Sequence, residues 1–471
     1  MALRFPLHMP SPFAPWFRGA SLLLLLLFLV PSAARGLTVG EERRMGREAA
    51  EQFLARLGQT EDRAVEEYVQ RIGGEIVAAN QPQLFNYTFY VVDDPSINAF
   101  AIPGGYVFVH AGLLLAADSE EEVAGVLAHE IGHVSGRHIS RQISKMSKIN
   151  LASFATLLGA IFLANDPKTA AAIGSAALAG STSMQLRYSR EMEEEADRLA
   201  FGYLMKARYD PRGLTGFMRK IMENSISSDL LPSYLTTHPG PDQRLMYLEG
   251  LVSSAADSLP PPRDSTRFKR IKTRLYVRNK DFQSSMNHFG RELGANPKDV
   301  DARYGLAMAY QKDGKIGDAL ENYRMALEIA PADPDILRDM GICHLLSGDP
   351  WEAIPRLDSA TRINPRDVVA LYHLGLAHKE TGNTQQAISS FERGIAQDPE
   401  FNTIYYHLGI CYGSSGEECK AYYYLGEYHR RRGDLKQARR NYERALTRCP
   451  EDAPTVVLID EAIKELHVRH P

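Results

Sequence analysis

The stretch 129–133 reads HEIGH, and it lies within residues 121–133, whose apolar side chains recur at helical spacing. On a helix, residues four apart share one face at about 6 Å, so His129 and His133 can reach one metal ion. Glu130 is turned about 100° away, where it can take a proton from water but is poorly placed as a ligand. This is the H-E-x-x-H pattern of zinc hydrolases. The alternative is a chance match on an ordinary helix.

A zinc hydrolase needs a third protein ligand. Metzincins place a histidine six residues after the second one, but that position is Ile139 here, and His138 is one residue short. Gluzincins use a glutamate from a later helix, which leaves the fourth zinc position open for water. The helix predicted at 187–201 offers Glu193, and Asp197 four residues on could accept the N–H of a ligand imidazole and fix its tautomer. Spacing leaves three rivals of Glu193 open: Glu191, Glu194 and Glu195.

The residues before the metal helix predict a small β-sheet. Residues 87–92 are β-branched and aromatic, and 97–102 and 106–110 read as a hairpin around Pro-Gly-Gly. In many zinc peptidases an edge strand beside the metal helix pairs with extended substrate through main-chain hydrogen bonds. The alternative is a core hairpin without a substrate role. The candidate substrate-binding residues are Asn98, Ala99, Phe100, Ala101, Ile102 and Pro103.

Three stretches together resemble the prenyl-protease/HtpX-like family of zinc metallopeptidases: HEIGH at 129–133, the later Glu193 and Asp197, and NAFAIPGGYVFV at 98–109. The resemblance covers residues 40–250. It implies a zincin-type α+β domain that holds one Zn²⁺ per chain. The ligands it implies are His129, His133 and Glu193, with Glu130 as the catalytic base. Integral-membrane members have several long apolar spans that this chain lacks, so it is more similar to the soluble, exported branch.

The stretch TTHPGPDQR at 236–244 is similar to a stretch of the same branch. The resemblance implies that His238 reaches the zinc or stabilises the oxyanion, and that Arg244 helps to hold the loop. A histidine in the fourth zinc position would displace the water and silence the enzyme. A surface loop that closes the domain is the plainer alternative.

The N-terminal residues predict an export signal. Arg4 and Arg18 precede a short apolar run at 22–30, and small residues follow, so we expect a signal peptide at 1–34 that is cleaved near Ala34. The run is too short to span a bilayer, and a retained N-terminal anchor is the alternative. With 54 Lys and Arg, 58 Asp and Glu and a formal charge of −4, nucleic acid is not an expected partner.

Residues 149–180 form two apolar arms around a polar turn, each too short to cross a membrane as a helix. We favour a mobile lid that touches a membrane surface or a partner. An interfacial segment and a buried core hairpin are the alternatives.

The second half of the chain repeats with a period of 34 residues, as in tetratricopeptide repeats. The repeated positions include Gly314, Gly348 and Gly382, then Ala319, Ala353 and Ala387, then Pro331, Pro365 and Pro399. The unit ending at Pro297 is degenerate. After Pro399 the phase shifts by 17 residues, so one helix near 418–432 is expected to serve two units.

This pattern gives a mainly α protein with three parts after the signal. A metallopeptidase domain is predicted at 37–250, a Ser- and Pro-rich linker at 251–265, and an all-α repeat solenoid at 266–471. None of the four cysteines is near the metal helix. Cys419 opens the first helix of the last unit and Cys449 closes the second, which predicts a disulfide between them.

A zinc peptidase domain, an export signal and a repeat array together are similar to the periplasmic β-barrel assembly-enhancing protease family. The resemblance implies cleavage of unfolded or misassembled outer-membrane proteins, docking on the β-barrel assembly machinery through the repeats, and a chaperone role. A chaperone or scaffold with an occluded zinc site is the alternative. The intact Glu130 favours the peptidase, because a purely structural zinc site needs no base.

Overall fold

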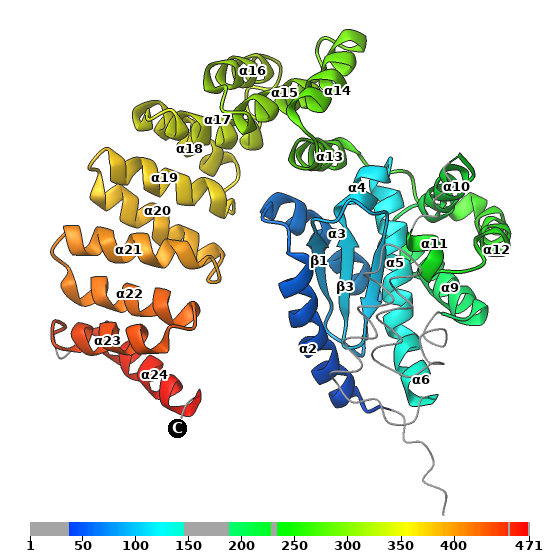
Figure 1. Cartoon of the computed structure of the whole chain (residues 1–471), viewed down its shortest axis with the longest axis horizontal. Helices are drawn as coiled ribbons and strands as arrows, with labels where there is room; N and C mark the ends of the chain where they lie inside the picture. The colour runs from blue at the N-terminus through cyan, green and yellow to red at the C-terminus, as the bar shows by residue number, and fades with distance from the viewer. Residues whose placement is uncertain (1–36, 146–187, 228–232, 451–452, 470–471) are drawn as a thin grey trace, which may run out of the picture. The chain divides into compact units, whose positions relative to one another are not determined.

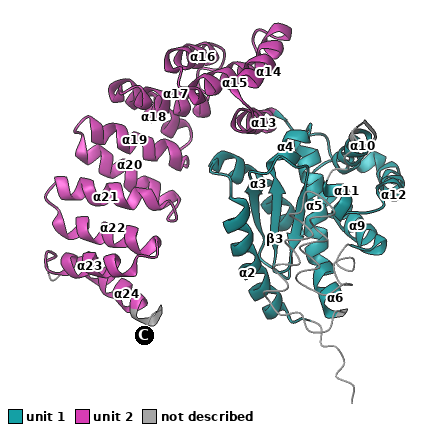
Figure 2. Ribbon diagram, viewed as in Figure 1, with its two compact units in different colours: residues 1–265 teal, residues 266–471 magenta. Residues whose placement is uncertain are grey.

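The computed structural model describes residues 37–145, 188–227, 233–450 and 453–469. They form two compact units, unit 1 up to Ser265 and unit 2 from Thr266 (Figure 2). The predicted signal peptide and the segment 149–180 lie outside the described residues. Among the described helices, none combines the length and the apolar character that crossing a bilayer requires.

Unit 1 is a small sheet surrounded by helices (Figure 1). The strand order is β1-β3-β2, with β1 parallel and β2 antiparallel to β3, so β2 lies at an edge of this sheet. The described elements are α2 (Val39–Leu57), α3 (Arg63–Ala79), β1 (Thr88–Val92), β2 (Ala99–Ile102), β3 (Tyr106–His110), α4 (Ala111–Ala116), α5 (Glu120–Ser135), α6 (His138–Lys145), α9 (Arg190–Ala207), α10 (Arg212–Ser227), α11 (Ser233–Thr237) and α12 (Pro241–Ser254).

The two faces of the sheet are covered by different helices, because strand side chains alternate between faces. Phe100 and Phe108 share one face and meet Phe53 of α2, with ring centroids 5.8 and 5.7 Å away. Phe89 points to the other face, where α3 approaches so closely that a Cβ on Gly73 would lie 2.3 Å from its ring. The aromatic core thereby fixes the strands that lead into α5.

Helices α5 and α9 carry the predicted metal ligands and pack against each other. Ser119 caps α5 by accepting from the backbone N–H of Glu122, and Ser189 caps α9 in the same way. The helices approach closely at Gly132, where a Cβ would lie 2.8 Å from the carbonyl oxygen of Ala196. Small residues at this crossing bring the glutamate of α9 beside the histidines of α5.

The predicted linker is held against unit 1 by Arg263. α12 runs to Ser254, a short 3₁₀ helix follows at Ala256–Ser258, and the remaining residues are irregular. The guanidinium of Arg263 lies 3.6 Å from the ring centre of Tyr209 and 2.6 Å from Glu75 Oε2. Its backbone N–H donates to Glu121 Oε1 at 2.5 Å. A stretch with the composition of a linker is therefore anchored.

Unit 2 is a stack of antiparallel helix pairs, which confirms the predicted repeat fold. Gly314, Gly348 and Gly382 turn the chain between the two helices of a pair with φ of 77–79°, a conformation that favours glycine. The helices are α13 (Thr266–Asn279), α14 (Phe282–Ala295), α15 (Val300–Lys312), α16 (Ile316–Ile329), α17 (Pro334–Leu346), α18 (Pro350–Ile363), α19 (Val368–Glu380), α20 (Thr384–Gln397), α21 (Asn402–Ser414), α22 (Glu418–Arg431), α23 (Leu435–Leu446) and α24 (Pro454–Arg469).

Helix α22 serves two repeats, as the shift of phase predicts. Towards α21, its Leu425 fills the space beside Gly409, where a Cβ would lie 2.8 Å away. Towards α23, its own Gly426 makes room for Tyr442, where a Cβ would lie 2.5 Å from the ring. The predicted disulfide between Cys419 and Cys449 is confirmed and ties the start of α22 to the end of α23.

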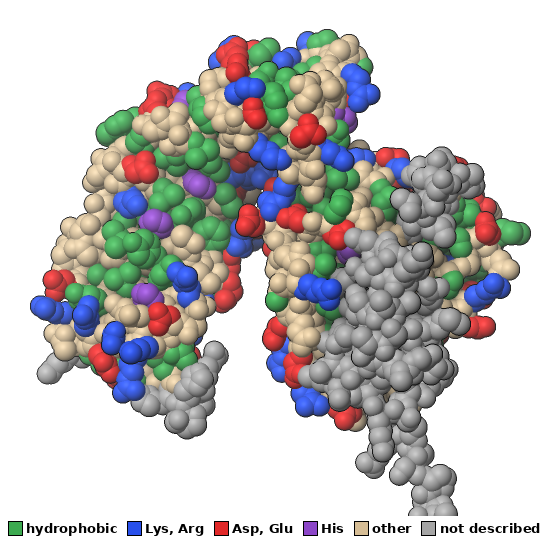
Figure 3. Space-filling model, viewed as in Figure 1, with side chains coloured by type: hydrophobic (Ala, Val, Ile, Leu, Met, Phe, Trp, Pro, Cys, Tyr) green, Lys and Arg blue, Asp and Glu red, His purple; other side chains and the backbone are tan. Residues whose placement is uncertain are grey.

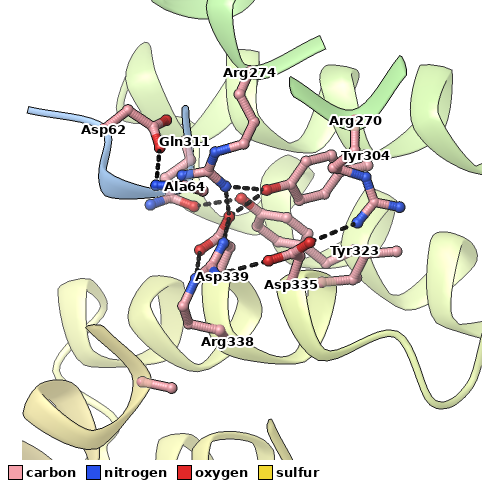
Figure 4. A network of polar contacts seen from close by, with 12 residues as sticks. Asp62, Ala64, Arg270, Arg274, Tyr304, Gln311, Tyr323, Asp335, Arg338 and Asp339 are labelled. Carbon is pink, nitrogen blue, oxygen red and sulfur yellow. Dashed lines mark hydrogen bonds and ion pairs between the residues drawn. The ribbon is translucent and has the colours of Figure 1, made fainter. Parts of the chain in front are cut away.

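A polar network joins the degenerate first helix pair to the rest of unit 2 (Figure 4). Arg274 of α13 lies 2.7 Å from Asp339 of α17. Arg338 lies 2.7 Å from both Asp335 and Asp339. Arg270, also on α13, lies 3.6 Å from Asp335. Where α13 lacks the repeat's motif residues, buried ion pairs therefore connect it to α17.

One face of unit 2 is partly apolar. In Figure 3, hydrophobic and histidine side chains gather over its middle helices, and lysines and arginines gather towards its C-terminal end. Tyr406 and Ile410 of α21 are 41% and 40% exposed. Repeat arrays use such extended faces to bind other proteins.

Candidate active site

Four buried side chains from three parts of unit 1 come together. His129 and His133 come from α5, Glu193 comes from α9, and His238 comes from the loop between α11 and α12. One possible ligand atom of each residue lies within 4.8 Å of the others. The helix pair supplies three of these residues, and a segment further along the chain supplies the fourth, 45 residues after Glu193.

The spacing of these atoms fits one zinc ion. A tetrahedral zinc site with bonds of about 2.0–2.2 Å separates its ligand atoms by roughly 3.3 Å. The Nε2 atoms of His129 and His133 are 2.9 Å apart, and each lies 3.4 Å from an oxygen of Glu193. His238 Nδ1 is 3.3 Å from His129 Nε2 and 3.2 Å from Glu193 Oε1. Two imidazoles and a carboxylate, with a third imidazole as fourth donor, are the ligand types that zinc prefers.

Two charged residues support the ligands from behind. His129 turns its other nitrogen, Nδ1, to Asp197 Oδ1 at 2.8 Å. Arg244 lies 2.6 Å from Glu193 Oε2 and grips Asp197 with two hydrogen bonds of 2.7 and 2.8 Å. The predicted loop residue Arg244 therefore contacts both carboxylates of α9.

The local charges shift the protonation of these groups. Burial disfavours protonated His129, but Asp197 and Glu193 outweigh it and raise its pKa to about 9. Burial lowers the pKa of His133 well below its usual value, and Glu193 only partly opposes this. Burial would raise the pKa of Glu193, but Arg244 and the histidines hold it well below its usual range. The ionised carboxylate of Glu193 and the neutral imidazole of His133 are the forms that bind a cation, whereas a metal would have to displace a proton from His129.

Glu130, which follows His129 on α5, also faces the group of three histidines and Glu193. It is fully buried, and its Oε1 lies 3.4 Å from Nε2 of His238. Burial raises its pKa above the usual carboxyl value, and the charges of His238 and His129 oppose this. A carboxyl group with a raised pKa beside a metal group is suited to exchange protons with a reactant.

The His238 loop has a defined conformation. The ring of His238 stacks on Tyr234 at 4.4 Å, and Gly240 with φ 75° precedes Pro241 at the first position of α12. The backbone N–H of Tyr234 donates to the carbonyl of Ile97 at 3.1 Å, just before β2. The segment that carries His238 is thus hydrogen-bonded to the end of the edge strand.

The edge strand divides the predicted substrate residues into two sets. The carbonyl of Asn98 accepts a hydrogen bond from the backbone N–H of His110 in β3 at 3.0 Å. In an antiparallel strand, the backbone N–H and C=O groups of every second residue point away from the neighbouring strand. The backbone groups of Ala99 and Ala101 therefore point to the outer edge, and the backbone of Ala101 faces Glu130. The side chains of Phe100 and Ile102 instead belong to the hydrophobic core. Ala101 and Pro103 line a small cavity beside His133.

The rivals of Glu193 are not in the group. Glu191 and Glu194 are exposed, and Glu195 is partly exposed and lies 2.7 Å from Arg141. Sequence reasoning missed two residues that contact the ligands. Tyr188 stacks on His133 at 3.8 Å, and His138 Nδ1 lies 2.8 Å from His133 Nδ1. Burial, reinforced by Arg141, lowers the pKa of His138 to about 4.

A buried H-E-x-x-H helix with a glutamate from a later helix defines the gluzincin class of metallopeptidases. Residues 61–252 match the model of peptidase family M48, so unit 1 contains an M48 metallopeptidase domain. Tetratricopeptide-repeat models match residues 273–334, 310–377, 368–401 and 419–452 of unit 2. The match at 419–452 follows the repeat phase that is shifted by 17 residues after Pro399.

Relatives of this chain include a putative beta-barrel assembly-enhancing protease of Vibrio cholerae serotype O1, 37% identical over 39% of this chain and 38% of that protein. The beta-barrel assembly-enhancing protease of Escherichia coli (strain K12) is 30% identical over 45% of this chain and 44% of that protein. The mitochondrial metalloendopeptidase OMA1 of Bos taurus is 33% identical over 36% of this chain and 33% of that protein. The matches thus span less than half of each relative. The match to the crystal structure of YrrB, a tetratricopeptide-repeat protein, covers 41% of this chain and 97% of the YrrB chain, with 18% identity and a TM-score of 0.33.

Proposed function

We propose that this protein is a zinc-dependent endopeptidase of the periplasm that degrades misfolded or stalled outer-membrane proteins and assists their assembly. The observation that carries the proposal is the convergence of His129, His133 and Glu193 in one buried group that Glu130 also faces. The names of the beta-barrel assembly-enhancing proteases, together with the export signal expected at 1–34, favour this compartment and this substrate class.

In this proposal, His129, His133 and Glu193 would hold a zinc ion, which would supply Lewis-acid chemistry at the attacking water and the scissile carbonyl. Glu130 takes the proton of the attacking water and gives it to the leaving amine. Its raised pKa suits both transfers, because a carboxyl group with an ordinary value would be too weak a base near neutral pH. Asp197 keeps the proton of His129 on Nδ1, so that Nε2 is free to bind the metal.

Substrate would bind as an added strand along β2. The backbone groups of Ala99 and Ala101 that point outward offer main-chain hydrogen bonds to the substrate. Asn98 and Pro103 lie at the two ends of this strand. Such pairing does not depend on the substrate side chains, which suits a protease for unfolded chains. The side chains of Phe100 and Ile102 would act only by holding the strand in place.

A latent state of the same site is the second candidate. His238 Nδ1 lies 3.3 Å from His129 Nε2 and 3.2 Å from Glu193 Oε1, where it would act as a fourth ligand. The backbone N–H of Tyr234 in α11 donates to the carbonyl of Ile97, next to the proposed substrate edge. In this state the zinc position that needs water is closed, and the chain would act as a chaperone or scaffold. Displacing the loop would free both the zinc position and the edge together.

Client choice would lie in unit 2. The partly exposed face around Tyr406 and Ile410 would dock on the β-barrel assembly machinery or on unfolded outer-membrane proteins. The segment 149–180 would touch the membrane surface. Nucleic acid is not a proposed partner.

The proposal is tested with the full chain, zinc and an unfolded outer-membrane protein. Glu130→Gln should retain zinc but lose cleavage by about 100-fold or more, because the proton acceptor is gone. A chelator should abolish cleavage by the wild type, and returning zinc should restore it. If Glu130→Gln cleaves at the wild-type rate, the peptidase assignment is wrong.

His238→Ala tests the latent state in the same assay. It should raise cleavage, because the fourth position opens to water. Tyr247, an α12 residue outside the four-residue group, offers Tyr247→Phe as the control, which should cleave like the wild type. If His238→Ala cleaves no faster than the wild type, His238 does not close the site.

A further inference from the structure

The proposed ligand His133 meets a second buried histidine on the side facing away from Glu193. His138 opens α6, and its Nδ1 lies 2.8 Å from Nδ1 of His133. On one continuous helix, residues five apart would point about 140° apart. The chain instead breaks after α5 at Arg137, whose φ of 51° is left-handed, and this break returns His138 to the ring of His133.

The position of the proton between the two rings follows from the ligand geometry. His133 turns Nε2 to the ligand group, 2.9 Å from His129 Nε2, and a nitrogen that binds a metal carries no proton. With a metal on Nε2, Nδ1 of His133 would keep its proton and donate a hydrogen bond to Nδ1 of His138. The proton of His138 then lies on Nε2, which is 3.3 Å from Oε2 of Glu195. Arg141 holds that same oxygen at 2.7 Å.

We propose that His138, backed by Glu195, is a positioning residue that fixes the tautomer and the ring orientation of His133. This inference rests on the proposed function, because it concerns the metal that the function requires. It gives the second histidine of the motif what Asp197 gives His129, an acceptor for its outer N–H. The ring of His138 lies between His133 and the carboxylate of Glu195, whereas the carboxylate of Asp197 contacts His129 directly.

The surroundings leave little freedom for His138. Its side chain is fully buried, and a Cβ on Gly136 would lie 2.3 Å from its Nε2. Tyr188 stacks on His133 at 3.8 Å and meets the edge of His138 at 6.3 Å. Both rings of the histidine pair are thus enclosed on several sides, and the hydrogen bond between them sets their relative rotation.

The test measures zinc affinity of the full chain by competition with a chromophoric chelator. His138→Phe keeps a ring but removes the acceptor, and we expect zinc to bind about 10–100-fold more weakly. His138→Asn places an amide oxygen where Nδ1 stood, and we expect it to recover most of the affinity. The visible spectrum of the Co²⁺-loaded protein should change in His138→Phe and return towards the wild type in His138→Asn.

Two controls separate positioning from folding. Glu194→Gln changes an exposed glutamate next to Glu195 and should leave zinc affinity unchanged. Urea unfolding of the metal-free variants shows whether each one folds. If His138→Phe binds zinc as tightly as the wild type, or if a folded His138→Asn is as weak as His138→Phe, the proposal fails while the wild-type site still binds zinc. A wild type that binds no zinc would instead overturn the proposed function.

Discussion

At the scale of residues, Arg244 is the counter-charge on which the ligand group depends. It contacts Glu193 and grips Asp197, and both carboxylates are fully buried. Arg244→Leu would leave the histidines as the remaining counter-charges of two buried carboxylates in the metal-free protein. We expect the free energy of unfolding near neutral pH to fall by about 3–5 kcal/mol, measured by urea denaturation of the chelator-treated protein.

The loss should depend on pH in a defined direction. The pKa values of Glu193 and Asp197 are lowered in the folded chain, so their stabilisation is present above the ordinary carboxyl values and lost as the pH falls through the lowered ones. The gap between wild type and Arg244→Leu should therefore narrow as the pH falls below about 4. Arg219→Leu, which breaks an exposed pair with Glu249, should cost at most about 1 kcal/mol. A gap that is constant with pH would contradict this account.

Sequence reasoning reached those site residues whose placement follows from regular structure. His129 and His133 share a helix face by spacing alone, and Glu193 required a resemblance as well, because several glutamates of α9 had suitable spacing. His138 was out of reach. Its contact with His133 depends on the left-handed turn at Arg137, and a non-glycine residue in that conformation gives no periodic signal.

At the scale of elements, the close crossing of α5 and α9 sets the distance between ligands. Gly132→Ala places a Cβ 2.8 Å from the backbone oxygen of Ala196, so the helices must separate. We expect a loss of about 1–3 kcal/mol in unfolding free energy from overpacking. Zinc should also bind more weakly, because Glu193 moves away from the histidines. Chelator competition and urea denaturation measure the two effects.

Gly202, which lies on α9, provides a matched control for the crossing at Gly132. A Cβ at Gly202 meets nothing within 4 Å, so Gly202→Ala should be neutral or stabilise by up to about 1 kcal/mol through helix propensity. Zinc affinity should not change. If Gly132→Ala binds zinc as the wild type does, the helix crossing does not set the ligand distances.

Element type was predictable because periodicity is local, whereas element ends were less so. β1 begins at Thr88, one residue after the predicted start, and α9 continues to Ala207 instead of ending near Phe201. Helical packing persists through the buried Leu204, and the helix ends only at Arg208, with φ 59°. The predicted end followed the acidic run and overlooked this last apolar turn.

At the scale of the whole molecule, repetition made unit 2 readable from sequence. The 17-residue shift after Pro399 required a shared helix, and α22 is that helix. The ion pairs that connect α13 to α17 were not predictable, because Arg274 and Asp339 are 65 residues apart and neither belongs to the repeated motif. Contacts between distant residues outside the repeated pattern leave no trace in a single sequence.

The end of unit 1 also differs from what composition indicates. Ser and Pro at 251–265 predict a linker, and within it Arg263 contacts Tyr209, Glu75 and Glu121. These contacts make residues up to 265 part of the metallopeptidase unit. The stability of unit 1 should therefore depend on residues that sequence composition assigns to the linker.

Truncated proteins that start at residue 37 test this dependence. The protein that ends at Ser265 should have a free energy of unfolding about 1–2 kcal/mol higher than the protein that ends at Ser258, measured by urea denaturation. Only the longer protein keeps the cation–π contact and the partly exposed ion pair of Arg263. Arg263→Ala in the longer protein should lower its stability to that of the shorter one. Arg263→Lys should fall between them, because a lysine keeps the charge but cannot make the same planar contacts. Equal stability of all four proteins would show that 259–265 is a linker in fact as well as in composition.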